Sequence, residues 1–346
     1  MTTMRAAVLT GTRQVEVTSV ARPEPGPDEV LVRVMSNTLC GSDVHAFEGS
    51  HARVRPGMWF GHEAAGVVEA VGSTTSLLVP GQRVAVDSVL VCNDCPPCRQ
   101  GHTNRCLRYT TTGSRGDGAL AEFVRVPVDN VFPIPDGLGF DDAALIQPLA
   151  IAHHAVHDRA DLRPEDVVVI IGAGPIGLFT LLLCHAIGVT TVVADLNPAR
   201  LEFARTLGAT RTVDVAEEDL TAVVRGMTDQ IGSAHTFDCV GGETTKVLAT
   251  ACDLTRVGGT ITIVGTYATA VTLPATTFTR RELTVVACKG YPSTAYAACA
   301  SLVTSGDLVM PQLVSHQFGL GGAQEALERL SASDGTIVKA AIHPWA

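Results

Sequence analysis

The stretch VVVIIGAGPIGLFTLLLCHAIG, from Val167 to Gly188, decides the fold of this 346-residue chain. Its five opening apolar residues predict a buried strand, and the apolar run behind them predicts a buried helix. Between the two, Gly172, Gly174 and Gly177 stand in the spacing G-x-G-x-x-G. The first glycine permits a tight turn, the second lets the backbone approach a pyrophosphate, and the third lets the helix pack on the strand. The pyrophosphate then lies at the positive end of the helix dipole, so the stretch predicts a dinucleotide-binding domain.

Strands and helices alternate throughout the part of the chain that follows Asp166. We expect strands at 167–171, 190–195, 211–215, 234–240, 259–265 and 282–288, and helices that start near Pro175, Pro198, Glu217, Glu243 and Thr276. Repeats of this kind predict a parallel sheet that is covered by helices on both faces.

The end of the second expected strand bears on the choice of cofactor. Asp195 stands there, 18 residues after Gly177. A carboxylate at this place accepts hydrogen bonds from the ribose hydroxyls and repels a 2′-phosphate, so NAD is favoured over NADP. Arg200 argues the other way, because a nearby guanidinium can accommodate a phosphate. The expected cofactor contacts are Gly172, Gly174, Pro175, Ile176, Gly177, Asp195, Arg200, Val240, Val264 and Gly265.

The N-terminal part of the chain has a different pattern. Up to about residue 132, short alternating strands are separated by turns rich in Gly, Pro, Asn and Asp, which predicts a partly closed barrel. After Pro292 come a helix, an extended piece, a helix and a strand, a tail too small to fold alone. We expect the tail to return to the first domain. The domains are then 1–148 with 292–346, and 149–291 inserted between them.

The bulk composition excludes several classes of protein. Apolar residues make up 46% of the chain and charged residues 17%, a globular balance. The net charge of −10 argues against a nucleic-acid partner, because phosphate binding needs a basic surface. The run from Val167 to Val189 is the nearest candidate for a membrane span, but glycine and proline interrupt it, and it predicts a buried strand and a buried helix instead. The N-terminus has no signal-peptide pattern. We therefore expect no membrane association and a cytoplasmic location.

Four of the ten cysteines gather in one polar loop, at Cys92, Cys95, Cys98 and Cys106. In a reducing compartment they are not expected to form disulfides. Four thiolates at this spacing suit tetrahedral zinc, and four protein ligands leave no open position for chemistry. We predict a structural zinc in a lobe of residues 88–108.

A second metal pattern joins CGSDVH, residues 40–45, to GHE, residues 61–63. Cys40, His62 and Glu63 offer one sulfur, one nitrogen and one oxygen. Three protein ligands leave a place for water or substrate, as in catalytic zinc sites. A single buried Cys or His is more often part of a core, but the nucleotide motif and the cysteine lobe together favour a second, catalytic zinc.

Over its whole length the chain resembles the zinc-dependent medium-chain dehydrogenase/reductase family, and within it the polyol (sorbitol-type), threonine and sugar dehydrogenases. The motifs that carry the resemblance are CGSDVH, GHEAAGVVEAVG, QPLAIAHHA and ADLNPARLEFARTLGA. It implies an α/β fold, with a GroES-like β-barrel catalytic domain and an inserted Rossmann domain whose parallel sheet is doubly wound. It also implies a zinc-dependent NAD(P) oxidoreductase that takes a hydride from a secondary hydroxyl, with one catalytic and one structural zinc.

The same resemblance assigns roles around the opening motif. It implies that Cys40 and His62 bind the catalytic zinc, with Glu63 as a third or alternating ligand. It implies that Ser42 hydrogen-bonds the reacting oxygen and that His45 relays the proton outward. Ser42 could instead cap the helix that follows it.

One residue departs from the pattern of these relatives. Polyol and threonine dehydrogenases usually have an acidic residue before the PL element, where this chain has Gln147. An amide oxygen can approach zinc but is a poorer ligand than a carboxylate, so we expect a somewhat lower metal affinity. The cysteine that completes the site in ethanol-type relatives is absent from LIQPLA, which argues against a simple ethanol dehydrogenase.

The expected substrate is polar and hydroxylated. Phe47, Lys289 and Tyr291 are expected to line the pocket, with Arg115 and Asp117 near it. A polyol, sugar or (amino)cyclitol fits these residues, and a threonine-like amino alcohol is the alternative. An alternative of another class is a non-catalytic scaffold that binds zinc and nucleotide. From the family we also expect a homo-oligomer, a tetramer or else a dimer, assembled through the edge of the parallel sheet.

Overall fold

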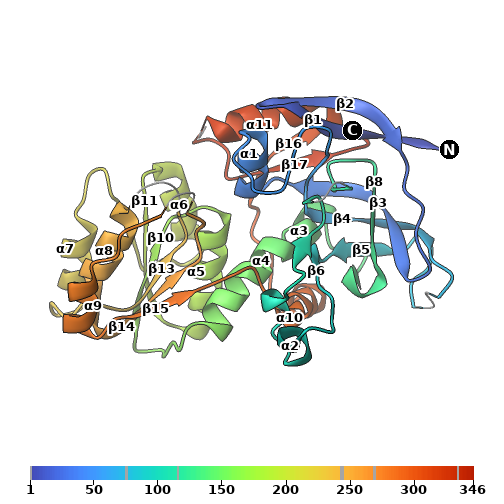
Figure 1. Cartoon of the computed structure of the whole chain (residues 1–346). Helices are drawn as coiled ribbons and strands as arrows, with labels where there is room; N and C mark the ends of the chain where they lie inside the picture. The colour runs from blue at the N-terminus through green and yellow to red at the C-terminus, as the bar shows by residue number, and fades with distance from the viewer. Residues whose placement is uncertain (1, 75–76, 115–116, 242–244, 268–269, 333–334) are drawn as a thin grey trace. The chain divides into compact units, whose positions relative to one another are not determined.

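The computed structural model describes residues 2–74, 77–114, 117–241, 245–267, 270–332 and 335–346. The chain divides into two compact units (Figure 1). The first unit comprises Met1–Gln147 and Pro292–Ala346, and the second comprises Pro148–Tyr291. Among the described helices, none is both long enough and apolar enough to cross a bilayer.

The second unit is built on a parallel sheet. Its six strands are β10 (Val167–Ile171), β11 (Thr190–Asp195), β12 (Arg211–Asp214), β13 (Ser233–Asp238), β14 (Thr255–Ile263) and β15 (Thr284–Ala287). They lie in the order β12-β11-β10-β13-β14-β15, so the strand order reverses beside β10. This is the order of a doubly wound dinucleotide-binding sheet, which binds its ligand at the carboxyl ends of the strands where the order reverses. The predicted fold class is confirmed.

Helices cover both faces of this sheet, as Figure 1 shows. They are α5 (Pro175–Ile187), α6 (Pro198–Thr206), α7 (Leu220–Met227), α8 (Lys246–Leu254) and α9 (Ala275–Arg281). Apolar side chains of α7, α8 and α9 pack with those of the strands in one core cluster, which includes Val169 and Ile261. Strands with both faces covered tend to be apolar throughout, as β10 is.

Two helix starts differ from the expected ones. The start expected near Glu217 was three residues early, because the Asp219 side chain caps α7 by accepting from the backbone N–H groups of Thr221 and Ala222. The start expected near Glu243 lies outside the described residues, and α8 begins at Lys246.

The first unit is built on a mostly antiparallel sheet. Its strands run in the order β16-β17-β3-β4-β5-β9, with β8 paired to β3. Their bounds are β3 (Glu29–Thr38), β4 (Glu63–Val71), β5 (Arg83–Val86), β8 (Phe123–Pro127), β9 (Val131–Pro133), β16 (Val314–Gly319) and β17 (Lys339–His343). A separate hairpin joins β1 (Thr3–Gly11) to β2 (Gln14–Ala21).

Shorter elements complete the first unit. They are α1 (Gly41–Phe47), β6 (Val89–Leu90), α2 (Pro96–Arg99), β7 (Thr110–Thr111), α3 (Phe140–Ala144), α10 (Ser293–Ser305) and α11 (Ala323–Ser331). A further helix, α4 (Ile146–His153), runs from the end of the first unit into the second. The tail after Pro292 thus contributes α10, α11, β16 and β17 to the first unit.

The pairing of three strands positions the candidate site. Thr38, at the end of β3, is paired with Glu63 at the start of β4. On its other side Thr38 is paired with Ala341 of β17. Continuing that antiparallel register by two residues sets Lys339 across from Cys40. Residues from three distant parts of the sequence therefore converge at one end of this sheet.

Candidate active site

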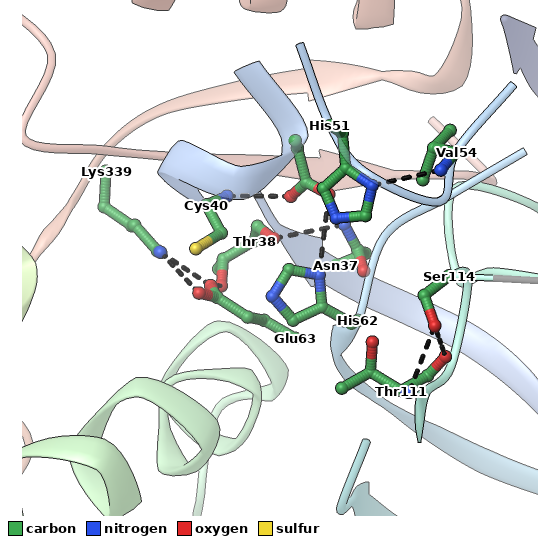
Figure 2. A network of polar contacts seen from close by, with 11 residues as sticks. Asn37, Thr38, Cys40, His51, Val54, His62, Glu63, Thr111, Ser114 and Lys339 are labelled. Atoms are coloured by element: carbon green, nitrogen blue, oxygen red, sulfur yellow. Dashed lines mark hydrogen bonds and ion pairs between the residues drawn. The ribbon is translucent and has the colours of Figure 1, made fainter. Parts of the chain in front are cut away.

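The structure brings together the three residues that the sequence singled out as catalytic-metal ligands. Cys40 precedes α1 as its N-cap, His62 comes just before β4, and Glu63 is the first residue of β4. One potential ligand atom from each, a sulfur, a ring nitrogen and a carboxylate oxygen, all lie within 4.8 Å of one another (Figure 2). This donor set and spacing fit a zinc ion with three protein ligands and one open position.

Asp43 connects two of these residues. Its carboxylate accepts a hydrogen bond of 2.8 Å from the backbone N–H of Cys40, and its other oxygen lies 3.5 Å from His62 Nδ1. The Nδ1 side of the ring therefore faces a carboxylate, which leaves Nε2 for a metal, the arrangement common around zinc-ligating histidines. From the CGSDVH motif we expect Asp43 to have a structural rather than a catalytic role and to orient a neighbour such as His62 or an arginine, and its approach to His62 Nδ1 agrees with that expectation.

The electrostatic surroundings of His62 favour a cation. Burial by itself would lower the pKa of its imidazole. The charge and hydrogen bonding of Asp43, helped by Cys40, outweigh burial and raise that pKa well above its ordinary value. A negative field that stabilises an imidazolium at this place also stabilises a divalent metal ion.

Glu63 forms an ion pair that was not among the expectations from the sequence. Its carboxylate is 1% exposed, and the Lys339 ammonium, 3% exposed, lies 2.6 Å from one oxygen and 2.9 Å from the other. The Thr38 hydroxyl donates a further hydrogen bond to the same carboxylate (Figure 2). The third candidate ligand is thus fully engaged with protein groups.

Gln147 also fits a role beside a metal. Its side chain is 4% exposed, and within the described part of the chain its Oε1 atom has no hydrogen-bond partner. A buried acceptor without a partner costs about 1–3 kcal/mol, which a neighbouring cation would relieve. Within the described part of the chain, the amide of Gln147 therefore has an oxygen that could still accept or coordinate.

Ser42 and His45 lie in α1, three residues apart and therefore on one face of the helix. The expected alternative role of Ser42 as a helix cap is wrong, because the N-cap is Cys40 and Ser42 lies inside the first turn. His45 Nδ1 lies 3.3 Å from the hydroxyl of Ser50, an exposed residue.

His51 is a neighbour of the site that sequence reasoning missed. Its ring lies beside that of His62 in Figure 2, and it interacts electrostatically with His62 and with Asp43. Nδ1 accepts backbone hydrogen bonds from Arg53 (3.2 Å) and Val54 (3.0 Å), so the neutral ring carries its proton on Nε2. Burial lowers the pKa of His51, against the opposing effect of Asp43. The loop sequence around His51 has no motif that could have indicated this position.

The four lobe cysteines also converge. Four of the Sγ–Sγ distances are 3.4 Å (Cys95–Cys98), 3.4 Å (Cys92–Cys106), 3.9 Å (Cys95–Cys106) and 4.0 Å (Cys92–Cys98). Sulfurs bonded tetrahedrally to zinc at about 2.3 Å stand roughly 3.8 Å apart, so the geometry fits a closed zinc site. A disulfide would need about 2.05 Å.

Backbone groups already favour thiolates in this lobe. A hydrogen bond from the backbone of Leu107 lowers the pKa of the Cys95 thiol to about 6. The backbone N–H groups of Cys92 and Arg108 point at the sulfur of Cys106, at 3.5 and 3.3 Å. Burial raises the pKa of Cys98 to about 12, so this thiol needs the charge of a metal to ionise at neutral pH.

The glycine turn after β10 has the form that a pyrophosphate needs. Gly172 has φ +101°, and a Cβ on Gly177 would lie 1.8 Å from the carbonyl oxygen of Gly172. Both glycines are therefore required by the chain itself. A Cβ on Gly174 would meet nothing within 4 Å, so packing does not explain that glycine, whereas close approach of a ligand does. Pro175 and Ile176 follow as the first residues of α5.

Asp195 stands at the carboxyl end of β11 and is tied to this turn. One oxygen accepts from the backbone N–H of Ala173 at 2.6 Å, and the other accepts from Asn197 N–H at 2.8 Å. The carboxylate is half-buried. Because each oxygen has a second lone pair, both can still accept from a ribose. Arg200 lies in the first turn of α6, which the Asn197 side chain caps.

Asp238 accepts hydrogen bonds from the backbone of the remaining expected cofactor contacts, Val240, Val264 and Gly265. Its carboxylate accepts from the N–H groups of Val240 and Gly241 and from the Tyr267 hydroxyl, the last at 2.6 Å. Its carbonyl oxygen accepts from Val264 N–H and Gly265 N–H. The Val240 side chain is 49% exposed, an apolar surface at the edge where the ligand is expected.

The expected substrate residues have mixed placements. Phe47 is fully buried in a core cluster with Leu327 and lies under the Arg13 guanidinium, which favours a packing role. Tyr291 is fully buried and Lys289 is exposed. Asp117 forms a surface ion pair with Arg125, and Arg115 lies outside the described residues.

Comparison with known proteins identifies the family. Residues 26–136 match the alcohol dehydrogenase GroES-like domain, and residues 175–305 match the zinc-binding dehydrogenase domain. The chain is 35% identical to L-idonate 5-dehydrogenase of Vitis vinifera, over 96% of its own length and 93% of that protein. It is 32% identical to sorbitol dehydrogenase of Bacillus subtilis (strain 168), over 99% and 97%.

A solved structure agrees with this assignment. The fold matches a proposed zinc-binding dehydrogenase from Sinorhizobium meliloti 1021, bound to NADP, with a TM-score of 0.91 and 30% identity, over 99% of this chain and 100% of that one. The chain belongs to the zinc-dependent medium-chain dehydrogenase/reductase family, and it is an NAD(P)-dependent oxidoreductase of the alcohol dehydrogenase type.

The lobe makes a prediction about metal content. Cys95→Ser replaces one thiolate by a hydroxyl, a far weaker zinc ligand, so zinc should fall from about two ions per chain to about one. Elemental analysis after gel filtration measures this. Cys184→Ala, which removes a buried thiol from α5, is the control and should keep both ions. Retention of both ions by Cys95→Ser would contradict the lobe assignment.

Proposed function

We propose that this enzyme oxidises a secondary hydroxyl of a polyol, sugar or related polar alcohol with NAD, at a zinc ion held by Cys40 and His62. The convergence of Cys40, His62 and Glu63 ligand atoms within 4.8 Å carries the proposal. Gln147, whose buried Oε1 has no hydrogen-bond partner among the described residues, is proposed as a further group that could approach the ion. The names of the two curated relatives, an idonate and a sorbitol dehydrogenase, support a polyhydroxylated substrate.

The chemistry divides between the metal and the chain. When bound, zinc polarises the substrate oxygen and makes its hydroxyl more acidic. A bound nicotinamide would accept the hydride from the carbon, and the hydroxyl proton would have to leave by a separate route. Cys40 and His62 hold the ion, and Asp43 fixes the orientation of both ligands.

Ser42 and His45 are proposed as the path for that proton. A hydroxyl can accept one proton while it donates another, and imidazole exchanges protons near neutral pH. Their shared face of α1 and the contact of His45 with the exposed Ser50 support a route from the substrate oxygen toward solvent.

NAD is the proposed cofactor, with a structural zinc in the lobe as the second metal. The Asp195 carboxylate, fixed by two backbone N–H groups, supports NAD because its charge repels a 2′-phosphate. Assembly into a homo-oligomer, a tetramer by expectation, is supported by β15, which is an edge strand of the sheet in the described part of the chain.

The substrate class is tested by activity. The enzyme is tested with a panel of polyols, sugars, sugar acids, cyclitols, L-threonine and ethanol, and reduction of NAD is followed at 340 nm. A polyhydroxylated member of the panel should give the fastest reduction of NAD. Two or more substrate hydroxyls that bind polar groups should favour it over ethanol by about 100-fold in kcat/KM. Cys40→Ala should lose at least ~1,000-fold in turnover, yet bind NAD within about twofold of wild type.

Three results would contradict this proposal. If L-threonine or ethanol gave the highest kcat/KM, the proposed substrate class would be wrong. If the zinc-loaded enzyme oxidised no member of the panel, the result would favour a non-catalytic scaffold that binds zinc and nucleotide. Cys40→Ala could keep its turnover, which would remove the metal assignment.

The cofactor assignment has a test of its own. Asp195→Asn keeps an acceptor for Ala173 N–H but removes the charge, so the preference for NAD over NADP, measured as the ratio of kcat/KM values, should fall about tenfold or more. Asp195→Ala also removes the bond to the glycine turn, and it should raise the KM for both cofactors. An unaltered ratio in Asp195→Asn would show that the charge does not select the cofactor.

A further inference from the structure

The inference concerns the buried ion pair of Glu63 and Lys339. The strand register sets Lys339 of β17 beside the ends of β3 and β4, 276 residues along the chain from Glu63. Figure 2 shows its ammonium directed at the Glu63 carboxylate, on the side of the site where Cys40 lies. It contacts both carboxylate oxygens, at 2.6 and 2.9 Å.

Because both groups are buried, each charge of this pair requires the other. A carboxylate and an ammonium with 1% and 3% exposure would each be strongly unfavourable without the other. The chain has 22 arginines and only three lysines. Lysine is therefore rare in this chain, and one of the three is buried at this position. An ammonium is a compact point charge that can sit against both oxygens of one carboxylate.

The pair also sets the charge around the ion. A zinc ion with the Cys40 thiolate and the Glu63 carboxylate would be neutral overall, because His62 and Gln147 bring no charge. Lys339 restores one positive charge. It also competes with the ion for the same two oxygens, since each can be attracted to the ammonium or to the metal.

We propose that Lys339 is a positioning residue of the zinc site, which holds Glu63 back from the ion. The inference rests on the proposed zinc at Cys40 and His62. Held by Lys339 and Thr38, Glu63 is a reserve ligand, that is, a carboxylate near the ion that does not permanently fill its open position. The open position then stays available for the substrate oxygen, and the affinity of the site for zinc is kept moderate.

Without Lys339, the buried carboxylate would have the ion as its nearest counter-charge. Lys339→Met, which keeps much of the side-chain length, should therefore make Glu63 a permanent ligand. Zinc at this site should bind at least about tenfold more tightly, because an anionic ligand is added and a cation removed. The KM for the alcohol should rise severalfold, whereas the KM for NAD should not change.

Removal of the carboxylate instead of the ammonium should change the zinc affinity in the opposite direction. Glu63→Gln leaves Lys339 as an unpaired positive charge beside the ion, so zinc should bind at least about tenfold more weakly. The double variant Lys339→Met with Glu63→Gln has a neutral pair again, and its zinc affinity should return to within about threefold of wild type. Non-additivity of this kind is the signature of a direct interaction.

Zinc affinity is measured by competition of the holoenzyme with a chelator of known affinity, with zinc content followed by elemental analysis. Lys246→Met, the same substitution at an exposed lysine of α8, is the matched control and should leave zinc affinity unchanged. A purely structural lysine would lower stability in Lys339→Met without tightening zinc binding.

The outcomes separate this inference from the proposed function. Wild-type enzyme that holds only the cysteine-lobe zinc would overturn both. Two zinc ions in wild type, with unchanged or weaker binding in Lys339→Met, would overturn the role of Lys339 alone. Should Lys339→Met fail to fold, the comparison of Glu63→Gln with the double variant decides, and equal zinc affinities of these two would overturn the proposal.

Discussion

The pairing of β3 with β4 on one side and β17 on the other is the constraint on which the active site depends. Backbone pairing holds Thr38 between Glu63 and Ala341, and the meeting of Glu63 with Lys339 beside Cys40 follows from that register. A slip of one residue in either pairing would turn Glu63 or Lys339 to the opposite face of the sheet. The tail after Pro292 is therefore part of the scaffold of the candidate site, although Lys339 lies 276 residues from Glu63 along the chain.

The two candidate metal sites differ in how the chain supports them. The cysteine lobe draws all four ligands from residues 92–106, so a metal there needs only a local fold. The candidate site at Cys40 and His62 draws its surroundings from α1, β3, β4 and β17. Asp43 contacts Cys40 and His62, and Lys339 pairs with Glu63. A site assembled from distant elements can leave one position open, because no single loop has to close around the ion.

Much of this could be predicted from the sequence, because the informative signals are local. The glycine turn, the alternation of strands and helices and the four clustered cysteines each lie within a short stretch, and the fold class followed from them. The cap of α7 at Asp219 was missed because Glu217 and Asp219 are both plausible helix starts, and only the backbone geometry separates them. Lys339 was missed because its partner Glu63 lies 276 residues away in the sequence. His51 was missed because the loop around it has no recognisable motif. A lysine inside the apolar strand IVKAAIH is nevertheless a signal, since a buried ammonium requires a carboxylate.

The most direct test of the account is the position of the metal itself. Crystals of the zinc-loaded enzyme, measured on both sides of the zinc absorption edge, give an anomalous map that locates each zinc ion. The account predicts one peak within the four lobe cysteines and a second about 2.3 Å from Cys40 Sγ and about 2.1 Å from a ring nitrogen of His62. An active enzyme with no anomalous peak between Cys40 and His62 would contradict it.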